Sequence, residues 1–169
     1  DTVVRPPVSI ARLATIHVNA SIAPTAGLSI ASGVPARISV LRGDQSAAWK
    51  SRLLPSLLES QPGISLYDDL GSRYKPTLIA RGFTASPVVG LPQGISVFVD
   101  GVPVNEPDAG QVNFDLLPLQ HAEQVELLSG TASHLGPNSL GGAINIITRR
   151  GGTDAGGETA FDIGSHGSY

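Results

Sequence analysis

The stretch from Ile95 to Thr148 constrains the fold of this chain more than any other part of the sequence. It holds three runs rich in β-branched and other apolar residues, at 95–99, 124–128 and 143–148, and each run is bounded by turn residues. β-Branched residues favour extended backbone, whereas Gly, Pro and Asp favour turns between strands. With 20 Gly and 13 Pro among 169 residues, the chain is predicted to consist of many short elements rather than a helical bundle.

Shorter elements are predicted before this stretch. Alternating apolar and polar residues predict a strand at 36–41. Asp44 or Ser46 can cap a short helix that ends at Lys50, and Pro55 suits the first turn of a second helix. That second helix is predicted at 54–61, with a buried stripe of Leu54, Leu57 and Leu58. The chain should then be extended at 64–66, a loop at 67–76, a strand and turn at 77–82, and a second loop at 84–94.

The main stretch itself divides into strands and short turns. The pattern at 95–100 predicts a strand with two different faces, Ile95, Val97 and Val99 on one and Ser96, Phe98 and Asp100 on the other. A second strand at 123–128 should place Val125 and Leu127 opposite Glu123, Gln124 and Glu126. The remaining elements are an acidic turn at 105–110, a helical turn within 114–121, a short turn at 131–135 and a last strand at 143–148.

Four motifs in this region follow one another in the order and spacing of a known family. They are Arg81-Gly82-Phe83, Val99-Asp100-Gly101-Val102-Pro103, Gln124-Val125-Glu126 and Gly141-Gly142-Ala143-Ile144-Asn145-Ile146-Ile147-Thr148. Over residues 34–150 the chain resembles the plug domain of TonB-dependent outer-membrane receptors. The resemblance implies an α+β fold, a small mixed β-sheet with short helices, normally held inside an outer-membrane β-barrel of about 22 strands. That barrel would be missing from this chain, which is interpreted as an N-terminal fragment.

The two ends of the chain are predicted to differ from the plug. The segment 1–33 should be flexible, because its short β-prone pieces bury too little surface to offset the entropy of ordering. The segment 151–169 is interpreted as a Gly-rich hinge followed by the start of the first barrel strand, since apolar and polar residues alternate after the hinge.

The resemblance implies that the N-terminal segment carries a TonB box. Such a box is an extended piece that can add itself as a strand to the sheet of another protein, here the TonB C-terminal domain. Two pieces fit, and the sequence leaves both open: Asp1, Thr2, Val3 and Val4, or Thr15, Ile16, His17 and Val18.

Charge is divided unevenly along the chain. Residues 1–81 hold nine Lys/Arg and five Asp/Glu, whereas 82–148 hold no Lys/Arg and six acids, Asp100, Glu106, Asp108, Asp115, Glu123 and Glu126. Because an unpaired buried charge is costly, these acids are expected to be solvated or to meet cationic groups from elsewhere. The resemblance would make the inner wall of the barrel that second source. A net charge of −3 gives no reason to expect nucleic-acid binding.

Motifs for catalysis are absent or incomplete. The chain has no cysteine, which excludes disulfides, thiolate zinc sites and cysteine nucleophiles. The glycine-rich segment 136–142 lacks the Lys and Ser/Thr of a phosphate loop, no Gly-x-Ser-x-Gly is present, and the four histidines have no zinc-site spacing. Asp100 and Glu126 could form an acid–base pair, but a turn role for Asp100 and an arginine partner for Glu126 are favoured. We therefore expect no catalytic residue, no metal and no cofactor.

The resemblance implies transport across the outer membrane of a Gram-negative bacterium. A small ligand, such as a ferric siderophore, cobalamin or a carbohydrate, would bind at outer loops of the plug. TonB, reached from the periplasm, would then remodel the plug to open a path. The alternatives are a free-standing periplasmic binding module with the plug fold and, ranked below it, a small periplasmic hydrolase.

Particular residues can be assigned to these roles. The resemblance implies that Arg81 and Glu126 make plug–barrel contacts, although Ser129 stands where the family usually has a second arginine. Ligand contacts are expected from the long polar loops, because loops on a rigid scaffold commonly carry function. The residues proposed for these contacts are Tyr74, Gln93, Glu106 and Asp108.

Overall fold

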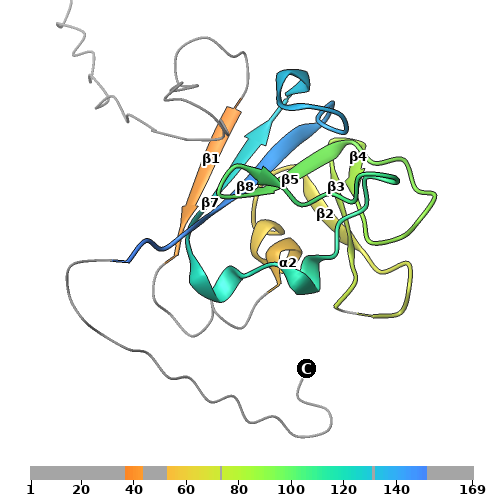
Figure 1. Ribbon diagram of the computed structural model, residues 1–169. Coiled ribbons are helices and arrows are strands. Elements are labelled where there is room, and N and C mark those ends of the chain that lie inside the picture. Colours follow the sequence, from red (N-terminus) through yellow and green to blue (C-terminus); the bar gives the residue numbers. More distant parts are fainter. Residues whose placement is uncertain (1–36, 44–52, 73, 131, 152–169) are drawn as a thin grey trace, which may run out of the picture.

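The computed structural model describes residues 37–43, 53–72, 74–130 and 132–151 (Figure 1). The expected helix at 44–50, both TonB-box candidates and nearly all of the predicted hinge and barrel strand lie outside these residues. In the described part, strands form a five-stranded and a three-stranded sheet, accompanied by one short α-helix and three 3-10 turns. The α+β fold with a small mixed sheet and short helices is thereby confirmed.

The five-stranded sheet contains the strands of the main stretch. Its order is β1 (Arg37–Arg42), β7 (Ala122–Ser129), β8 (Gly142–Thr148), β5 (Ile95–Val99) and β6 (Val102–Pro103). Only β8 and β5 are parallel, with Val97 opposite Ile144, and the other neighbours are antiparallel (Figure 1). The last strand in sequence thus lies at the centre of the sheet, which suits its continuous apolar run because both of its faces are covered.

The three-stranded sheet consists of β2 (Ile64–Tyr67), β3 (Thr77–Ala80) and β4 (Phe83–Ala85), all antiparallel. The strand β4 corrects the prediction of a loop from residue 84. Arg81 and Gly82 have φ angles of 53° and 86°, so they form a two-residue hairpin turn that sends the chain straight back along β3. The loop therefore starts only after Ala85.

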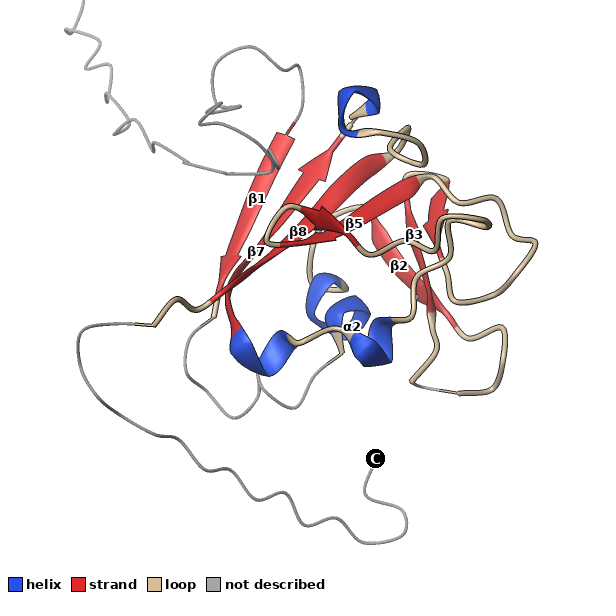
Figure 2. Ribbon diagram, viewed as in Figure 1, coloured by secondary structure: helices blue, strands red, loops and turns tan. Residues whose placement is uncertain are grey.

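A main core lies between the two sheets and the helix α2 (Leu54–Leu58), as the arrangement in Figure 2 shows. Leu54, Leu57 and Leu58 are all buried, which confirms the predicted stripe. The helix ends before the predicted Gln61, because the N–H of Gln61 already bonds to the Leu58 carbonyl in a tight turn. Two 3-10 turns, η2 (Phe114–Leu116) and η3 (Leu119–His121), replace the single turn expected at 114–121.

The opposite face of the large sheet is also buried. Phe98 and Leu128 lie there in a second cluster, with Ala132 and Ala143. The segment 132–141, which includes the 3-10 turn η4 (Ser133–Leu135), is tied to this face because the Ser96 hydroxyl donates to the Pro137 carbonyl at 2.9 Å. The strand 95–99 does have two different faces, as predicted: Ile95, Val97 and Val99 pack in the main core and Phe98 packs in the second cluster, so both faces are covered by protein. No helix in the described residues is long and apolar enough to cross a membrane.

Candidate functional site

Three polar loops, 68–76, 86–94 and 104–113, are joined by hydrogen bonds at their bases. The Thr77 hydroxyl donates to Asp69 at 2.6 Å and lies 2.7 Å from the Ser86 hydroxyl. The N–H of Val112 donates to the Ser86 carbonyl at 2.9 Å. Thr77 and Ser86 are buried, so these bonds form in a partly water-excluded setting, where an unmade bond would be costly. These three loops overlap the ligand loops predicted at 67–76, 84–94 and 105–115, and they share one hydrogen-bonded base.

Three of the four predicted ligand residues point out from these loops. Tyr74 is 56% exposed, and Glu106 and Asp108 are exposed. Among the described residues, no basic side chain forms an ion pair with either carboxylate. One ring and two carboxylates are therefore available to a molecule that covers the loops.

Gln93 has a different role. Its Oε1 accepts from the Ser86 N–H at 2.9 Å, and its Nε2 donates to the Leu91 carbonyl at 3.3 Å. The amide thus braces its own loop instead of standing free. A ligand would have to compete with these bonds, so the structure favours Gln93 as a support for the loop.

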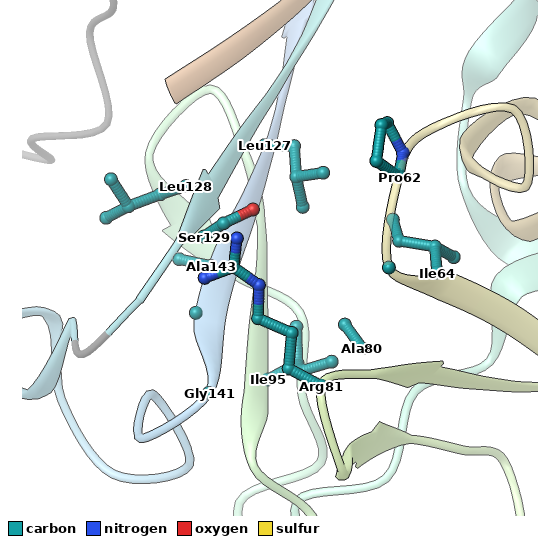
Figure 3. A pocket seen from close by; sticks show the side chains of 12 residues that line it. Pro62, Ile64, Ala80, Arg81, Ile95, Leu127, Leu128, Ser129, Gly141 and Ala143 are labelled. Carbon is teal, nitrogen blue, oxygen red and sulfur yellow. The ribbon is translucent and has the colours of Figure 1, made fainter. Parts of the chain in front are cut away.

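The turn residue Arg81 lies apart from the loops, at the seam between the two sheets. Its guanidinium extends over a pocket and points toward Ser129 (Figure 3). The pocket is lined by β2 and β3 on one side and by the ends of β5, β7 and β8 on the other. No described residue forms a hydrogen bond or ion pair with this guanidinium, and the residue is exposed. Its donors can therefore receive a carboxylate from outside the domain.

Glu126, the other predicted barrel contact, is fully buried on β7. Gln124 Nε2 donates to its Oε1 at 2.9 Å, and Asn145 Nδ2 donates to its Oε2 at 3.4 Å. Glu126 is therefore not one of the solvated acids, and the expectation that it meets a cationic group from elsewhere stays a prediction. Its position does not fit direct contact with a barrel wall.

Asp100 has the turn role expected for it. Asp100 and Gly101 have φ angles of 50° and 83° and form the tight turn between β5 and β6. The Thr148 hydroxyl donates to Oδ2 at 2.6 Å and the Thr148 N–H to Oδ1 at 2.9 Å. These two bonds, the hydroxyl bond first, hold the pKa of Asp100 below its ordinary 3.8; the Arg150 charge adds to them and burial opposes them.

The structure does not bring Asp100 and Glu126 together as an acid–base pair. The carboxylate of Asp100 is bound by Thr148, whereas that of Glu126 is bound by Gln124 and Asn145. The part of the chain that the structure describes also contains no group of three or more His, Cys, Asp or Glu that could hold a metal. Nothing in this geometry favours the hydrolase alternative.

Asn105 is the residue at the loops that sequence analysis missed. Its carboxamide makes three hydrogen bonds, two to β5 and one across its own loop. An Asn between Pro103 and Pro107, two residues from each, signals only a turn. The bonds to β5 depend on β6 folding back beside it, which no local pattern reveals.

Comparisons with known proteins agree with this architecture. A family model described as the TonB-dependent Receptor Plug Domain matches residues 31–143. The vitamin B12 transporter BtuB of Vibrio cholerae is 27% identical over 136 residues, which are 80% of this chain and 21% of that protein. The protein of the same name from Vibrio vulnificus is 28% identical over 133 residues, 78% of this chain and 21% of that protein. The chain thus spans about a fifth of the length of these curated relatives.

Solved structures show the same fold. The ferric enterobactin receptor PfeA in complex with BCV-L6 matches with a TM-score of 0.51 and 22% identity, over 71% of this chain and 18% of that one. FpvA of P. aeruginosa, bound to a heterologous pyoverdine, matches with a TM-score of 0.50 and 24% identity, over 69% of this chain and 14% of that one. Because the family model covers more than half of its length, the chain belongs to the family of TonB-dependent receptor plug domains.

Proposed function

We propose that this domain is the gate of a TonB-dependent receptor in the outer membrane of a Gram-negative bacterium, and that it admits a scarce small ligand. The observation that carries the proposal is the set of three loops joined through Thr77 and Ser86. A ligand that rests on any one of these loops would press on a base shared by all three. Ligand occupancy can therefore be passed into the two-sheet core.

The ligand is a siderophore, a cobalamin or a carbohydrate. Relatives named as a vitamin B12 transporter and as a ferric enterobactin receptor support the first two classes. Tyr74 would pack its ring against the ligand, while Glu106 and Asp108 would accept hydrogen bonds from it, with Gln93 holding the loop between them.

Two protein partners complete this function. The receptor's own C-terminal barrel would supply a carboxylate to Arg81, whose guanidinium is open to the outside of the domain. The TonB C-terminal domain would capture one of the N-terminal pieces, 1–4 or 15–18. Replacing each piece in turn by Gly and Ser should abolish capture by TonB for one of them only.

Transport can be tested in the full-length receptor carrying this domain. Uptake of radiolabelled cyanocobalamin and of a panel of ferric siderophores and oligosaccharides would be measured in cells, with and without TonB. We expect TonB-dependent uptake of one probe, and at least a tenfold loss of its binding when Tyr74, Glu106 and Asp108 are all changed to Ala. Glu59→Ala is the matched control, because Glu59 is exposed at the end of α2, outside the three loops. Uptake independent of TonB would contradict the proposal. Unchanged binding in the triple variant would move the ligand site away from these loops.

A further inference from the structure

The carboxamide of Asn105 replaces a strand residue at the edge of the large sheet. The N–H of Val104 donates to the Val97 carbonyl at 2.9 Å, as a residue continuing β6 would. The side chain of the next residue, Asn105, makes the following hydrogen bonds to β5. Its Oδ1 accepts from the Val97 N–H at 2.7 Å, and its Nδ2 donates to the Ile95 carbonyl at 3.2 Å. The backbone N–H of Val97 and the carbonyl of Ile95, at this edge of β5, are thus hydrogen-bonded by a side chain that mimics a peptide group.

The same carboxamide closes the loop that carries the two exposed acids. Nδ2 of Asn105 also donates to the Gly110 carbonyl at 2.8 Å, across the tip that contains Glu106 and Asp108. The N–H of Gly110 donates back to the Glu106 carbonyl at 2.7 Å. One side chain therefore connects the loop tip to the central sheet.

On its other side, this loop has little room to move because Asn138 and Gln93 lie close to Gly110. Gly110 has a φ of +69°, and a Cβ added there would lie 2.3 Å from Asn138 Nδ2 and 3.3 Å from Gln93 Cβ. The loop is consequently held between β5, through Asn105, and two neighbouring loops. If Asn105 lost its bonds, the loop could still touch its neighbours but would no longer be fixed to the sheet.

We propose that Asn105 is the positioning residue that fixes Glu106 and Asp108 in place for the ligand and couples their loop to strand β5. The ligand part of this inference rests on the proposed function. Only a carboxamide supplies one acceptor and two donors at this point. Aspartate would keep the acceptor toward Val97 but would face two carbonyl oxygens without a donor, and alanine would lose all three bonds.

The absence of cysteine allows a direct test in the 169-residue chain. Asp108→Cys provides a single thiol for a nitroxide label, and its spectrum would be compared in Asn105→Ala, Asn105→Asp and Ser96→Ala backgrounds. Ser96 is the matched control, because it is buried on β5 but bonds to Pro137 and Ser139, away from the labelled loop. Amide exchange at Val97 would be followed in parallel.

Asn105→Ala should mobilise the label and accelerate exchange at Val97 about tenfold, which corresponds to the loss of roughly 1.4 kcal/mol of hydrogen bonding. Asn105→Asp should mobilise the label while leaving Val97 exchange closer to that of the parent chain. Ser96→Ala should lower overall stability without mobilising the label. A label that stays restricted in both Asn105 variants would overturn the positioning role and leave the proposed transport function untouched. A mobilised label combined with unchanged probe uptake by the intact Asn105→Ala receptor would keep the structural role and remove the ligand role.

Discussion

Two tight turns of this domain have the same backbone and opposite uses of their side chains. Arg81-Gly82 and Asp100-Gly101 each place a non-glycine residue at a positive φ, followed by a glycine at a positive φ, and each joins two antiparallel strands. The carboxylate of Asp100 bonds to the domain's own chain, where Thr148 donates to both of its oxygens at the surface. Arg81 extends its guanidinium over the pocket between the sheets, without a partner among the described residues (Figure 3).

The difference shows which charges this domain uses for its own stability. A residue other than glycine at positive φ is costly, and Asp tolerates that conformation better than Arg. At Asp100 the cost is offset by two hydrogen bonds that fasten the end of β8. At Arg81 no comparable gain occurs within the described domain, so a strained turn presents a charge to the outside. We infer that the strain of the turn at Arg81 is offset by an interaction of its guanidinium with a partner.

The largest effect is predicted for a third charge, Glu126, which, like Asp100, is hydrogen-bonded to residues of the domain itself. Glu126→Arg should destabilise the 169-residue chain by about 3 kcal/mol or more, because it places an unmatched cation at a fully buried position. Glu123→Arg on the same strand is the control, since Glu123 is exposed and should change stability by less than about 0.5 kcal/mol. Urea unfolding measures both variants. Equally small stability losses in the two variants would show that Glu126, like Glu123, is accessible to solvent or to a partner.

A smaller loss is predicted when Asp100 is neutralised. Asp100→Asn keeps the tolerance for positive φ but replaces one acceptor oxygen with an amide that cannot accept from Thr148. Because the carboxylate is exposed, we expect a loss of only about 1 kcal/mol in the free energy of unfolding. Thermal or urea unfolding at neutral pH would show this loss. A variant as stable as the parent would show that the Asp100 side chain, like that of Arg81, does not stabilise the isolated domain.

The same carboxylate should give the domain a measurable dependence on acid pH. The folded pKa of Asp100 lies below its ordinary 3.8, so its contribution is present above that value and is lost as the pH falls through 3.8 toward the folded pKa. The difference in stability between the parent and Asp100→Asn should therefore shrink as the pH is lowered through this window. Unfolding measured at stepped pH values checks this, and a difference that grows in acid would contradict the sign.

The turns and most strands of this domain could be predicted from local sequence, whereas the burial of Glu126 could not. Asp-Gly predicted the turn at Asp100, and alternation or apolar runs predicted most strands. Burial of Glu126 was missed because alternation shows only that a strand has a polar position. Whether other parts of the chain cover that position depends on contacts between distant segments, which the pattern of one strand does not reveal.

Contacts between distant residues were missed for the same reason. Ser86 meets Thr77 only once β3 and β4 are paired, and Asn105 meets β5 only once β6 has folded back. The strand β4 itself was hidden because a two-residue turn leaves no visible loop. The placement of Tyr74, Glu106 and Asp108 on exposed loops followed from polarity alone and needed no such pairing.

The smallest effect on the isolated domain is predicted for Arg81, and it tests the central claim most directly. Arg81→Gln removes the charge without relieving the turn, and Arg42→Gln, at the exposed end of β1, is the matched control. Amide exchange at Ile144, in the centre of the large sheet, would be measured in the 169-residue chain and in the full-length receptor. Arg81→Gln should leave exchange in the chain within about twofold of the parent and accelerate it in the receptor about fivefold, as expected for a partly buried ion pair worth roughly 1 kcal/mol. Equal acceleration in both settings would show that Arg81 stabilises the domain from within, and no acceleration in the receptor would show that its charge has no partner there.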